Sequence, residues 1–155
     1  AITVDGQALG ECAYLRISPE AGSIEVGHIH LSPALQRSPA PTEAMFLMMQ
    51  RAFDARYRRY EWKCDALNRR SRAAAQRLGF SYEGVFRNAA VVKGRNRDTA
   101  WFACIADEWP ALRAAFEQWL APANFDPDGR QLIGLSQLTA PVLVGVDRLP
   151  ETGGD

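Results

Sequence analysis

The chain has 155 residues, 47% hydrophobic and 23% charged, which is the composition of one folded domain and excludes disorder of the whole chain. Lysine plus arginine and aspartate plus glutamate both number 18, so the formal charge is zero and gives no electrostatic reason to bind nucleic acid or an anionic membrane. The longest apolar runs, such as Ala44–Met49, fall far short of the roughly 20 residues of a membrane-spanning helix. We therefore expect a soluble protein with no nucleic-acid or membrane partner.

Three strands are expected in the first part of the chain. Ala1–Val4 and Cys12–Ile17 are apolar runs rich in β-favouring residues, and Asp5-Gly6-Gln7 between them is a turn signal, so the two runs predict antiparallel strands. After a second turn, Ser23–Leu31 alternates apolar with polar residues, which predicts a third strand. The alternation changes phase near Gly27, which predicts a bulge at or after that residue.

Two helices are expected in the middle of the chain, each preceded by a strand. Thr42–Arg56 has apolar residues at helical spacing and contains neither glycine nor proline. Arg59–Asp65 alternates as a half-buried strand. Asp65–Asn68 then offers N-cap residues for a helix over Ser71–Leu78, which Gly79 ends.

The last third of the chain predicts two more strands, a helix and a tail. Phe80–Arg87 and Thr99–Ile105 are strand patterns, and the polar link Lys93–Asp98 between them is expected to be a hairpin loop. An amphipathic helix is expected over about Asp107–Leu120. Residues from Pro122 onward are rich in proline and glycine and predict an extended, weakly structured tail. The element order predicts an α+β fold, with helices packed on a mixed sheet.

The three cysteines, Cys12, Cys64 and Cys104, lie far apart and form no C-x-x-C pair. This spacing suggests neither a disulfide framework nor a structural zinc site. The chain opens without a basic region followed by an apolar stretch, which is the pattern of a secretory signal. We therefore expect a cytoplasmic location.

The junction between the strand over 23–31 and the following helix is a candidate anion site. A strand that leads through a tight loop into a helix presents unpaired amides and the positive end of the helix dipole, which suits a phosphate group. Pro39 and Pro41 have no N–H, and Arg37 adds a charged side chain. The amides that remain as donors are those of Arg37, Ser38, Ala40 and Thr42. The alternative is a rigid loop in which Ser38 or Thr42 caps the helix.

The second strand–helix junction carries residues that resemble a known family. GNAT-superfamily acetyltransferases have the signature D-x-x-N-x-x-S followed by L-G-F-x-x-E-G. This chain resembles it with Asp65-Ala-Leu-Asn68-Arg-Arg-Ser71 and then Leu78-Gly79-Phe80-Ser-Tyr82-Glu83-Gly84. Gln36-Arg-Ser-Pro-Ala-Pro-Thr42-Glu43-Ala44 stands where the family carries Q-G-x-G-x-A-T-E-A, the loop around the acetyl-CoA pyrophosphate.

Within this superfamily the sequence resembles the RimJ/RimL type, the ribosomal-protein N-terminal acetyltransferases and their relatives. Ile24-Glu25-Val26-Gly27 before the loop and Lys93–Asp98 before the last strand are typical of that group. The similarity runs from about Leu9 to Trp109. It implies the GNAT fold and transfer of an acetyl group from acetyl-CoA to a primary amine, either a protein N-terminal α-amine or a small amine. The amine attacks directly, without a covalent enzyme intermediate.

Such a reaction needs a base for the ammonium proton, donors for the thioester oxygen and an acid for the departing thiolate. The resemblance implies that Glu25 is the carboxylate that acts through water; the alternative is a solvent-facing strand glutamate. Many relatives use a tyrosine as the acid, but that position here is Ala75. The resemblance leaves Ser71 as the candidate acid or hydrogen-bond donor near the thioester sulfur, with helix capping as the alternative.

The resemblance also implies contacts with acetyl-CoA. The backbone of the strand before the loop pairs with the pantetheine arm, and Asn68 holds the cofactor or the splayed strands, with an N-cap role as the alternative. Residues 51–72 carry eight basic against three acidic residues, either as solvated surface or to attract the CoA phosphates. The candidate cofactor-binding residues are Ile29, His30, Leu31, Gln36, Arg37, Ser38, Ala40, Thr42, Asn68, Ser71 and Arg72.

His28 and His30 are two residues apart, which on a regular strand places both on one face, as in a metal pair. The sequence offers no evident third ligand. We therefore expect no metal, and assign these side chains to polar lining of the acceptor cleft or to exposed surface.

Relatives carry another strand and two helices before the segment that matches Ala1–Val4, and those helices form one wall of the acceptor site. We expect residues 1–121 to be a GNAT domain without that N-terminal part, followed by a tail over 122–155. An omitted segment is the favoured explanation, and the alternative is a truncated member whose acceptor site is open or completed by a second subunit. The final helix and the tail are candidates for pairing two copies in a homodimer.

Two functions stay open on the sequence. The first is an acetyl-CoA-dependent N-acetyltransferase. The second is a catalytically inactive GNAT-fold module that binds CoA or serves as an interaction domain, which Pro39 and Pro41 in the phosphate loop suggest. An unrelated α+β domain is disfavoured by the joint spacing of the two motifs.

Overall fold

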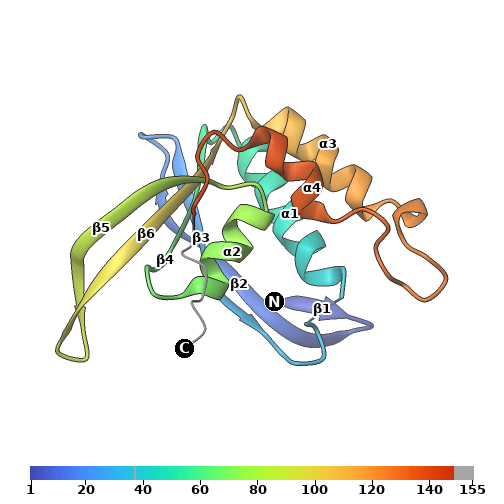
Figure 1. Ribbon diagram of the computed structural model, residues 1–155, viewed down its shortest axis with the longest axis horizontal. Coiled ribbons are helices and arrows are strands. Elements are labelled where there is room, and N and C mark those ends of the chain that lie inside the picture. The colour runs from blue at the N-terminus through green and yellow to red at the C-terminus, as the bar shows by residue number, and fades with distance from the viewer. Residues whose placement is uncertain (37, 149–155) are drawn as a thin grey trace.

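The polypeptide forms one six-stranded sheet with its helices packed on one face (Figure 1). The computed structural model describes residues 1–36 and 38–148. The strands are β1 Ile2–Val4, β2 Gln7–Ser18, β3 Ser23–Leu31, β4 Arg59–Asp65, β5 Ser81–Val92 and β6 Arg95–Ile105. The helices are α1 Ala40–Asp54, α2 Arg69–Arg77, α3 Trp109–Leu120 and α4 Leu135–Thr139, with short 3-10 turns at Pro122–Asn124 and Ala140–Val142. The predicted α+β fold is confirmed.

The sheet opens between its two parallel strands. Its order is β1-β2-β3-β4-β6-β5, and β3 and β4 run parallel while the other neighbouring strands are antiparallel. β3 and β4 pair over Ser23–Val26 and Arg59–Trp62 and then diverge, whereas β4 pairs with β6 along its whole length. The opening therefore lies at the end of the sheet where both parallel strands lead into helices.

The predicted bulge after Gly27 is confirmed. Ala13 of β2 lies opposite Gly27 and Glu11 lies opposite His30, so β3 holds one extra residue in this interval. His28 takes a left-handed φ of 49° there. A bulge changes the direction of the strand and the phase of its side chains, so His28 and His30 do not follow the regular alternation of a metal pair.

The core lies between the sheet and the helices. Met45 and Met49 of α1 and Leu112 of α3 pack against the sheet, and the rings of Phe46 and Phe116 stack with their centroids 5.5 Å apart. Alternate residues of three strands point to this side, as the period of a strand requires. These buried residues are Ile24, Val26, Tyr60, Trp62, Cys64, Ala100, Phe102 and Cys104. The other face of the sheet carries the charged residues of β3 and β4.

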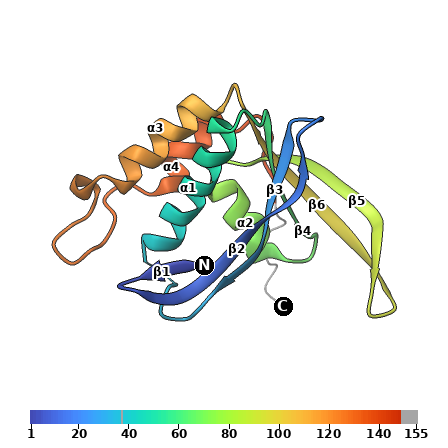
Figure 2. The same ribbon diagram turned by 180° about the vertical axis from the view of Figure 1, so that it is seen from behind.

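β5 and β6 form a hairpin that projects away from the helices (Figure 2). The polar link Lys93–Asp98, predicted as a loop, is mostly strand, because only Lys93 and Gly94 make the turn, with φ values of 50° and 75°. Two successive positive φ angles give a turn whose twist matches that of antiparallel strands. The ladder therefore continues to the pair Val92 and Arg95.

The prediction of an extended, weakly structured tail is wrong for the described part of that segment, which ends at residue 148. α4 packs against α2 and α3 (red in Figure 1), and its Leu135 is 1% exposed. The Thr139 hydroxyl donates a hydrogen bond to the carbonyl of Arg77 at 3.1 Å. The contacts are made by single buried residues that are separated by prolines and glycines. Such isolated residues leave no periodic pattern in the sequence.

Gly145 allows the C-terminal segment to lie directly against β5. The Tyr82 N–H donates to the Gly145 carbonyl at 2.9 Å, and a Cβ at position 145 would lie 2.1 Å from the Tyr82 carbonyl oxygen. We expect Gly145→Ala to lower the free energy of unfolding by about 1–3 kcal/mol in urea titrations. Gly134→Ala is the control, because its Cβ would meet no atom closer than 3.5 Å. Equal stability of the two variants would contradict this contact.

Candidate active site

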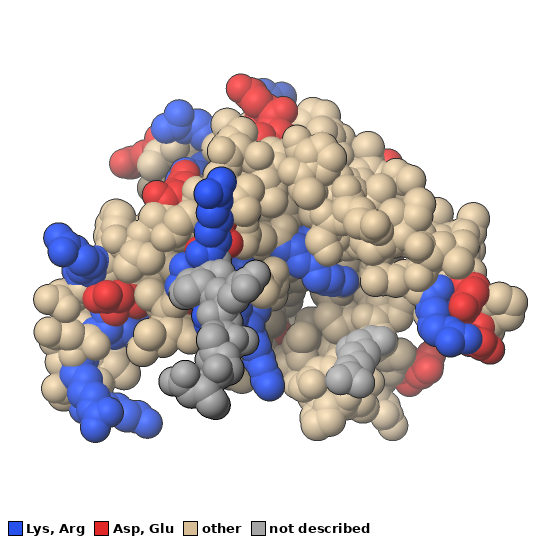
Figure 3. Space-filling model, in the orientation of Figure 1, with Lys and Arg blue, Asp and Glu red and all other residues tan. Residues whose placement is uncertain are grey.

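A cleft of about 660 Å³ occupies the opening between β3 and β4. Its walls come from both strands, the loop before α1, the first turn of α1 and one face of α2. Figure 3 shows a hollow near the centre of this face of the molecule, with lysine or arginine side chains beside it. Six of the predicted site residues line the cleft: Ile29, Leu31, Gln36, Thr42, Asn68 and Ser71.

The β3 wall of the cleft is a strand edge. Beyond Val26, the described residues of β3 form no ladder with β4, so the edge that faces the cleft is available to an extended ligand. Ile29 and Leu31 line the cleft. The His30 side chain is exposed, with its Nδ1 3.1 Å from Glu11 Oε1 on β2. Of the predicted stretch 29–31, Ile29 and Leu31 therefore line the cleft, whereas the His30 side chain is exposed to solvent.

The side chains of Ser38 and Gln36 hold the loop before α1, and the alternative in which Ser38 or Thr42 caps this helix is wrong. α1 begins at Ala40, two residues earlier than predicted, because proline is tolerated at a helix start. Among the described side chains none caps this helix. Ser38 Oγ donates to the Leu35 carbonyl at 2.8 Å, and Gln36 Nε2 donates to the Leu31 carbonyl at 3.3 Å. The prediction for Arg37 lies outside the described residues.

Asn68 and Ser71 form the start of α2 and face the cleft together. Asn68 is the N-cap, and its side-chain oxygen accepts the Ser71 N–H at 3.0 Å. Ser71 Oγ in turn accepts a hydrogen bond from Trp62 Nε1 at 3.1 Å. Because Trp62 donates to it, this oxygen has a fixed position and its own proton is directed elsewhere. The N-cap role of Asn68 is thus present in the structure, and it places the Ser71 hydroxyl in the cleft.

The arginines of α2 divide between the cleft and the C-terminal segment. Arg72 Nε and Nη2 each lie 2.6 Å from an oxygen of Asp147, and Nη1 donates to the Ala66 carbonyl. Arg72 therefore lies outside the cleft, whereas Arg70 and Arg77 line it. Helical spacing explains this division, because residues 70, 71, 74 and 77 lie within an arc of about 120° around the helix, whereas residue 72 lies about 160° from residues 70 and 74.

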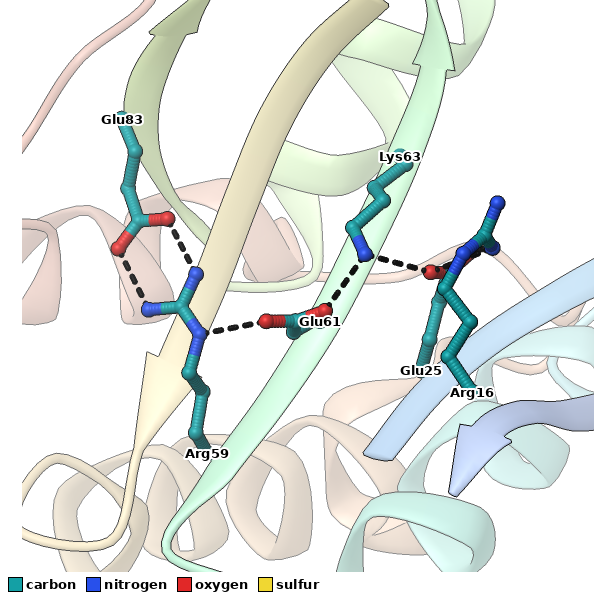
Figure 4. Close-up of polar contacts among 6 residues, drawn as sticks. All are labelled: Arg16, Glu25, Arg59, Glu61, Lys63 and Glu83. Carbon is teal, nitrogen blue, oxygen red and sulfur yellow. Dashed lines mark hydrogen bonds and ion pairs between the residues drawn. The ribbon is translucent and has the colours of Figure 1, made fainter. Parts of the chain in front are cut away.

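Glu25 belongs to a charged network on the open face of the sheet, which runs from Arg16 at one end to Glu83 at the other (Figure 4). Its side chain is 4% exposed, so it is not the solvent-facing glutamate of the alternative interpretation. Both oxygens accept from Arg16 Nη1 at 2.8 Å, and Lys63 Nζ lies 3.0 Å from Oε2. Lys63 lines the cleft, so it connects the carboxylate to the cleft wall. Two cations therefore hold the Glu25 carboxylate next to the cleft.

The network continues along β4 to Glu61. Lys63 Nζ lies 2.8 Å from Glu61 Oε2, and Arg59 bonds both Glu61 and Glu83. Burial acts to raise the pKa of Glu61, but the hydrogen bonds from Lys63 and Arg59 outweigh it and hold that pKa below its usual range. The ammonium group of Lys63 also lies 3.8 Å from the centroid of the Trp101 ring. These contacts fix Lys63 between two carboxylates.

The remaining chemistry of the cleft is limited. Burial raises the pKa of the Cys64 thiol, which disfavours the thiolate that a nucleophile needs. Within residues 1–36 and 38–148, no three His, Cys, Asp or Glu side chains gather as a metal ion would require.

The helices in residues 1–36 and 38–148 lack the length and apolar character of a membrane span.

Comparisons with known proteins identify the family of this chain. The family model "Acetyltransferase (GNAT) domain" matches residues 1–81. The crystal structure of a GCN5-related N-acetyltransferase from Brucella melitensis shares 52% identity over 87% of this chain, with a TM-score of 0.84. A probable GNAT-family acetyltransferase from Chromobacterium violaceum shares 49% identity over 70% of this chain, with a TM-score of 0.66.

A third solved structure, the microcin C7 self-immunity acetyltransferase MccE in complex with acetyl-CoA and AMP, is 26% identical over 63% of this chain and 54% of its own, with a TM-score of 0.57. No curated protein sequence matches the chain significantly. The chain spans 62% and 54% of the length of the Brucella and Chromobacterium proteins. Because the family model covers more than half of its residues, the chain belongs to the GNAT family of acetyltransferases.

Proposed function

We propose that this protein transfers an acetyl group from acetyl-CoA to a primary amine bound at the cleft between β3 and β4. The acceptor is a protein N-terminal α-amine or a small amine, as in the RimJ/RimL type that the sequence motifs resemble. The observation that carries this proposal is the unpaired edge of β3, which faces Asn68 and Ser71 across the cleft. The complex of the related MccE protein with acetyl-CoA supports the same cosubstrate.

The residues of the cleft suit the parts of acetyl-CoA. The pantetheine arm carries amides that pair with a strand edge, and Ile29 to Leu31 offer one. The thioester then lies near Ser71, whose hydroxyl proton is free of the Trp62 contact and donates a hydrogen bond to the sulfur. The phosphates lie toward the start of α1 and the cations that line this end, Arg70 and Arg77. Basic residues therefore stand where the ligand is most negative.

In the proposed reaction the amine nitrogen attacks the thioester carbon, an N–C bond forms and the C–S bond breaks. An ammonium group must lose two protons in this process. One passes through water to Glu25, and the other ends on the sulfur of CoA, which the Ser71 hydroxyl stabilises as it departs. Lys63 and Arg16 act as positioning residues, because they hold the Glu25 carboxylate by ion pairs.

Release of free CoA thiol in the presence of an amine panel tests this function. The panel contains peptides with free N-termini and small primary amines, and binding of acetyl-CoA is measured in parallel by calorimetry. We expect acetyl-CoA to bind and at least one amine to give steady thiol release. Tight binding without release for any amine would contradict the transferase and favour the inactive CoA-binding module that Pro39 and Pro41 suggest. Absence of binding would contradict both.

A further inference from the structure

Arg77, at the end of α2, lies between two hollows of the protein. It lines the cleft on one side and, on the other, a second hollow of about 380 Å³. The second hollow is formed by the end of the loop before α1, the end of α3 and the loop over residues 125–131. Arg77 Nη2 donates to Thr42 Oγ1 in the first turn of α1 at 3.1 Å. The guanidinium carbon lies 5.6 Å from the centroid of the Trp119 ring.

This guanidinium group is partly buried without an acidic partner. Among the described residues, no Asp or Glu lies within ion-pair distance of Arg77, whereas Arg59 and Arg72 are each paired with carboxylates. Burial alone lowers the pKa of Arg77, since no nearby carboxylate counteracts it. Burying a cation is unfavourable unless an anion compensates. The position of Arg77 therefore suits a bound anion.

The neighbouring start of α1 is poor in free amides. Pro39 and Pro41 have no N–H, and the amides of Thr42 and Glu43 both donate to the Pro39 carbonyl at 3.0 Å. Ala40 is thus the residue of this first turn whose amide donates to no other described residue. A phosphate group bound here needs further donors, and a guanidinium group supplies several in one plane.

We propose that Arg77 binds the pyrophosphate of acetyl-CoA and that the second hollow takes the adenosine end of the cosubstrate. This inference rests on the proposed function. The pyrophosphate joins the pantetheine arm to adenosine, so a ligand that occupies both hollows places it at their boundary. Arg77 stands at that boundary and replaces the amide donors that the two prolines remove. It lies outside the loop to which the family resemblance assigns this group.

The test compares Arg77→Gln and Arg77→Lys with the unmodified chain by calorimetry. The ligands are acetyl-CoA and S-acetylpantetheine, which has no phosphate. We expect Arg77→Gln to raise the Kd for acetyl-CoA about 10- to 100-fold, as loss of a hydrogen bond to a charged group predicts, and Arg77→Lys to recover part of it. The affinity for S-acetylpantetheine should stay the same. The affinity of Arg77→Gln for acetyl-CoA should also depend less on salt.

Arg113→Gln is the matched control, because Arg113 is an exposed arginine of α3 that pairs with Glu117. Unchanged acetyl-CoA affinity in Arg77→Gln would overturn the assignment while leaving the proposed function intact. An equal loss for both ligands would also overturn it, since Arg77 would then only support the shape of the cleft. If the unmodified chain binds no acetyl-CoA, the proposed function itself fails.

Discussion

Replacement of Glu25 by glutamine is expected to lower turnover by about 10²- to 10⁴-fold while changing the Kd for acetyl-CoA little. The carboxylate lies beside the cleft between Arg16 and Lys63, with a side chain that is 4% exposed. Glutamine keeps the shape and an acceptor oxygen but cannot take up a proton as a carboxylate does. Thiol release at saturating amine measures turnover, and calorimetry measures the Kd.

Glu11→Gln is the matched control for this prediction. Glu11 is also a strand glutamate, and it lies near the imidazole of His30, but its side chain is 67% exposed and lies outside the cleft lining. The Glu11→Gln variant should therefore leave turnover unchanged. Because glutamine leaves Arg16 and Lys63 without a charged partner, circular dichroism melting is used to verify that the Glu25→Gln variant is folded. Wild-type turnover in a folded Glu25→Gln variant would remove Glu25 from the mechanism.

Replacement of Asp147 by alanine is expected to lower the free energy of unfolding by about 3–5 kcal/mol. Asp147 bonds Arg72 through both oxygens at 2.6 Å, and the side chains are 3% and 14% exposed. Its removal leaves the Arg72 guanidinium buried and unpaired. The backbone of Asp147 is also bonded to Gln76, so the residue fastens the C-terminal segment to α2. Urea unfolding followed by circular dichroism measures the loss.

The matched control is Asp128→Ala in the same segment. Asp128 pairs with Arg130, but both side chains are more than 70% exposed. An exposed pair contributes at most about 1 kcal/mol, so this variant should be nearly as stable as the unmodified chain. A loss of less than about 1 kcal/mol in Asp147→Ala would contradict the role given to the buried pair.

Local patterns predicted most of the fold. β3 and β4 have the predicted bounds, Ser23–Leu31 and Arg59–Asp65, because alternation over seven or more residues is a strong signal. The bulge was visible as a change of phase near Gly27. The packing of residues 122–148 is not visible in any local pattern, since it depends on contacts such as that of Arg72 with Asp147, which are 75 residues apart. Partners so distant leave no mark in a single sequence.

The cleft was predicted in outline, and its charged side chains less well. Asn68 and Ser71 line it as the motif implied. Arg72 is among the predicted cofactor-binding residues, but its position on α2 is rotated by about 160° from that of Arg70, and Arg70 and Arg77 line the cleft instead. The burial of Glu25 depends on Arg16 and Lys63 from two other strands, so the sequence left its solvent-facing alternative open.

A crystal structure of this chain with acetyl-CoA tests the central claim most directly, which is that the opening between β3 and β4 binds this cosubstrate. We expect the pantetheine arm along β3 at Ile29–Leu31, the thioester sulfur beside Ser71 and the pyrophosphate at Arg77. Acetyl-CoA bound at another surface, with the cleft between Leu31 and Asn68 free of ligand density, would contradict the proposed function.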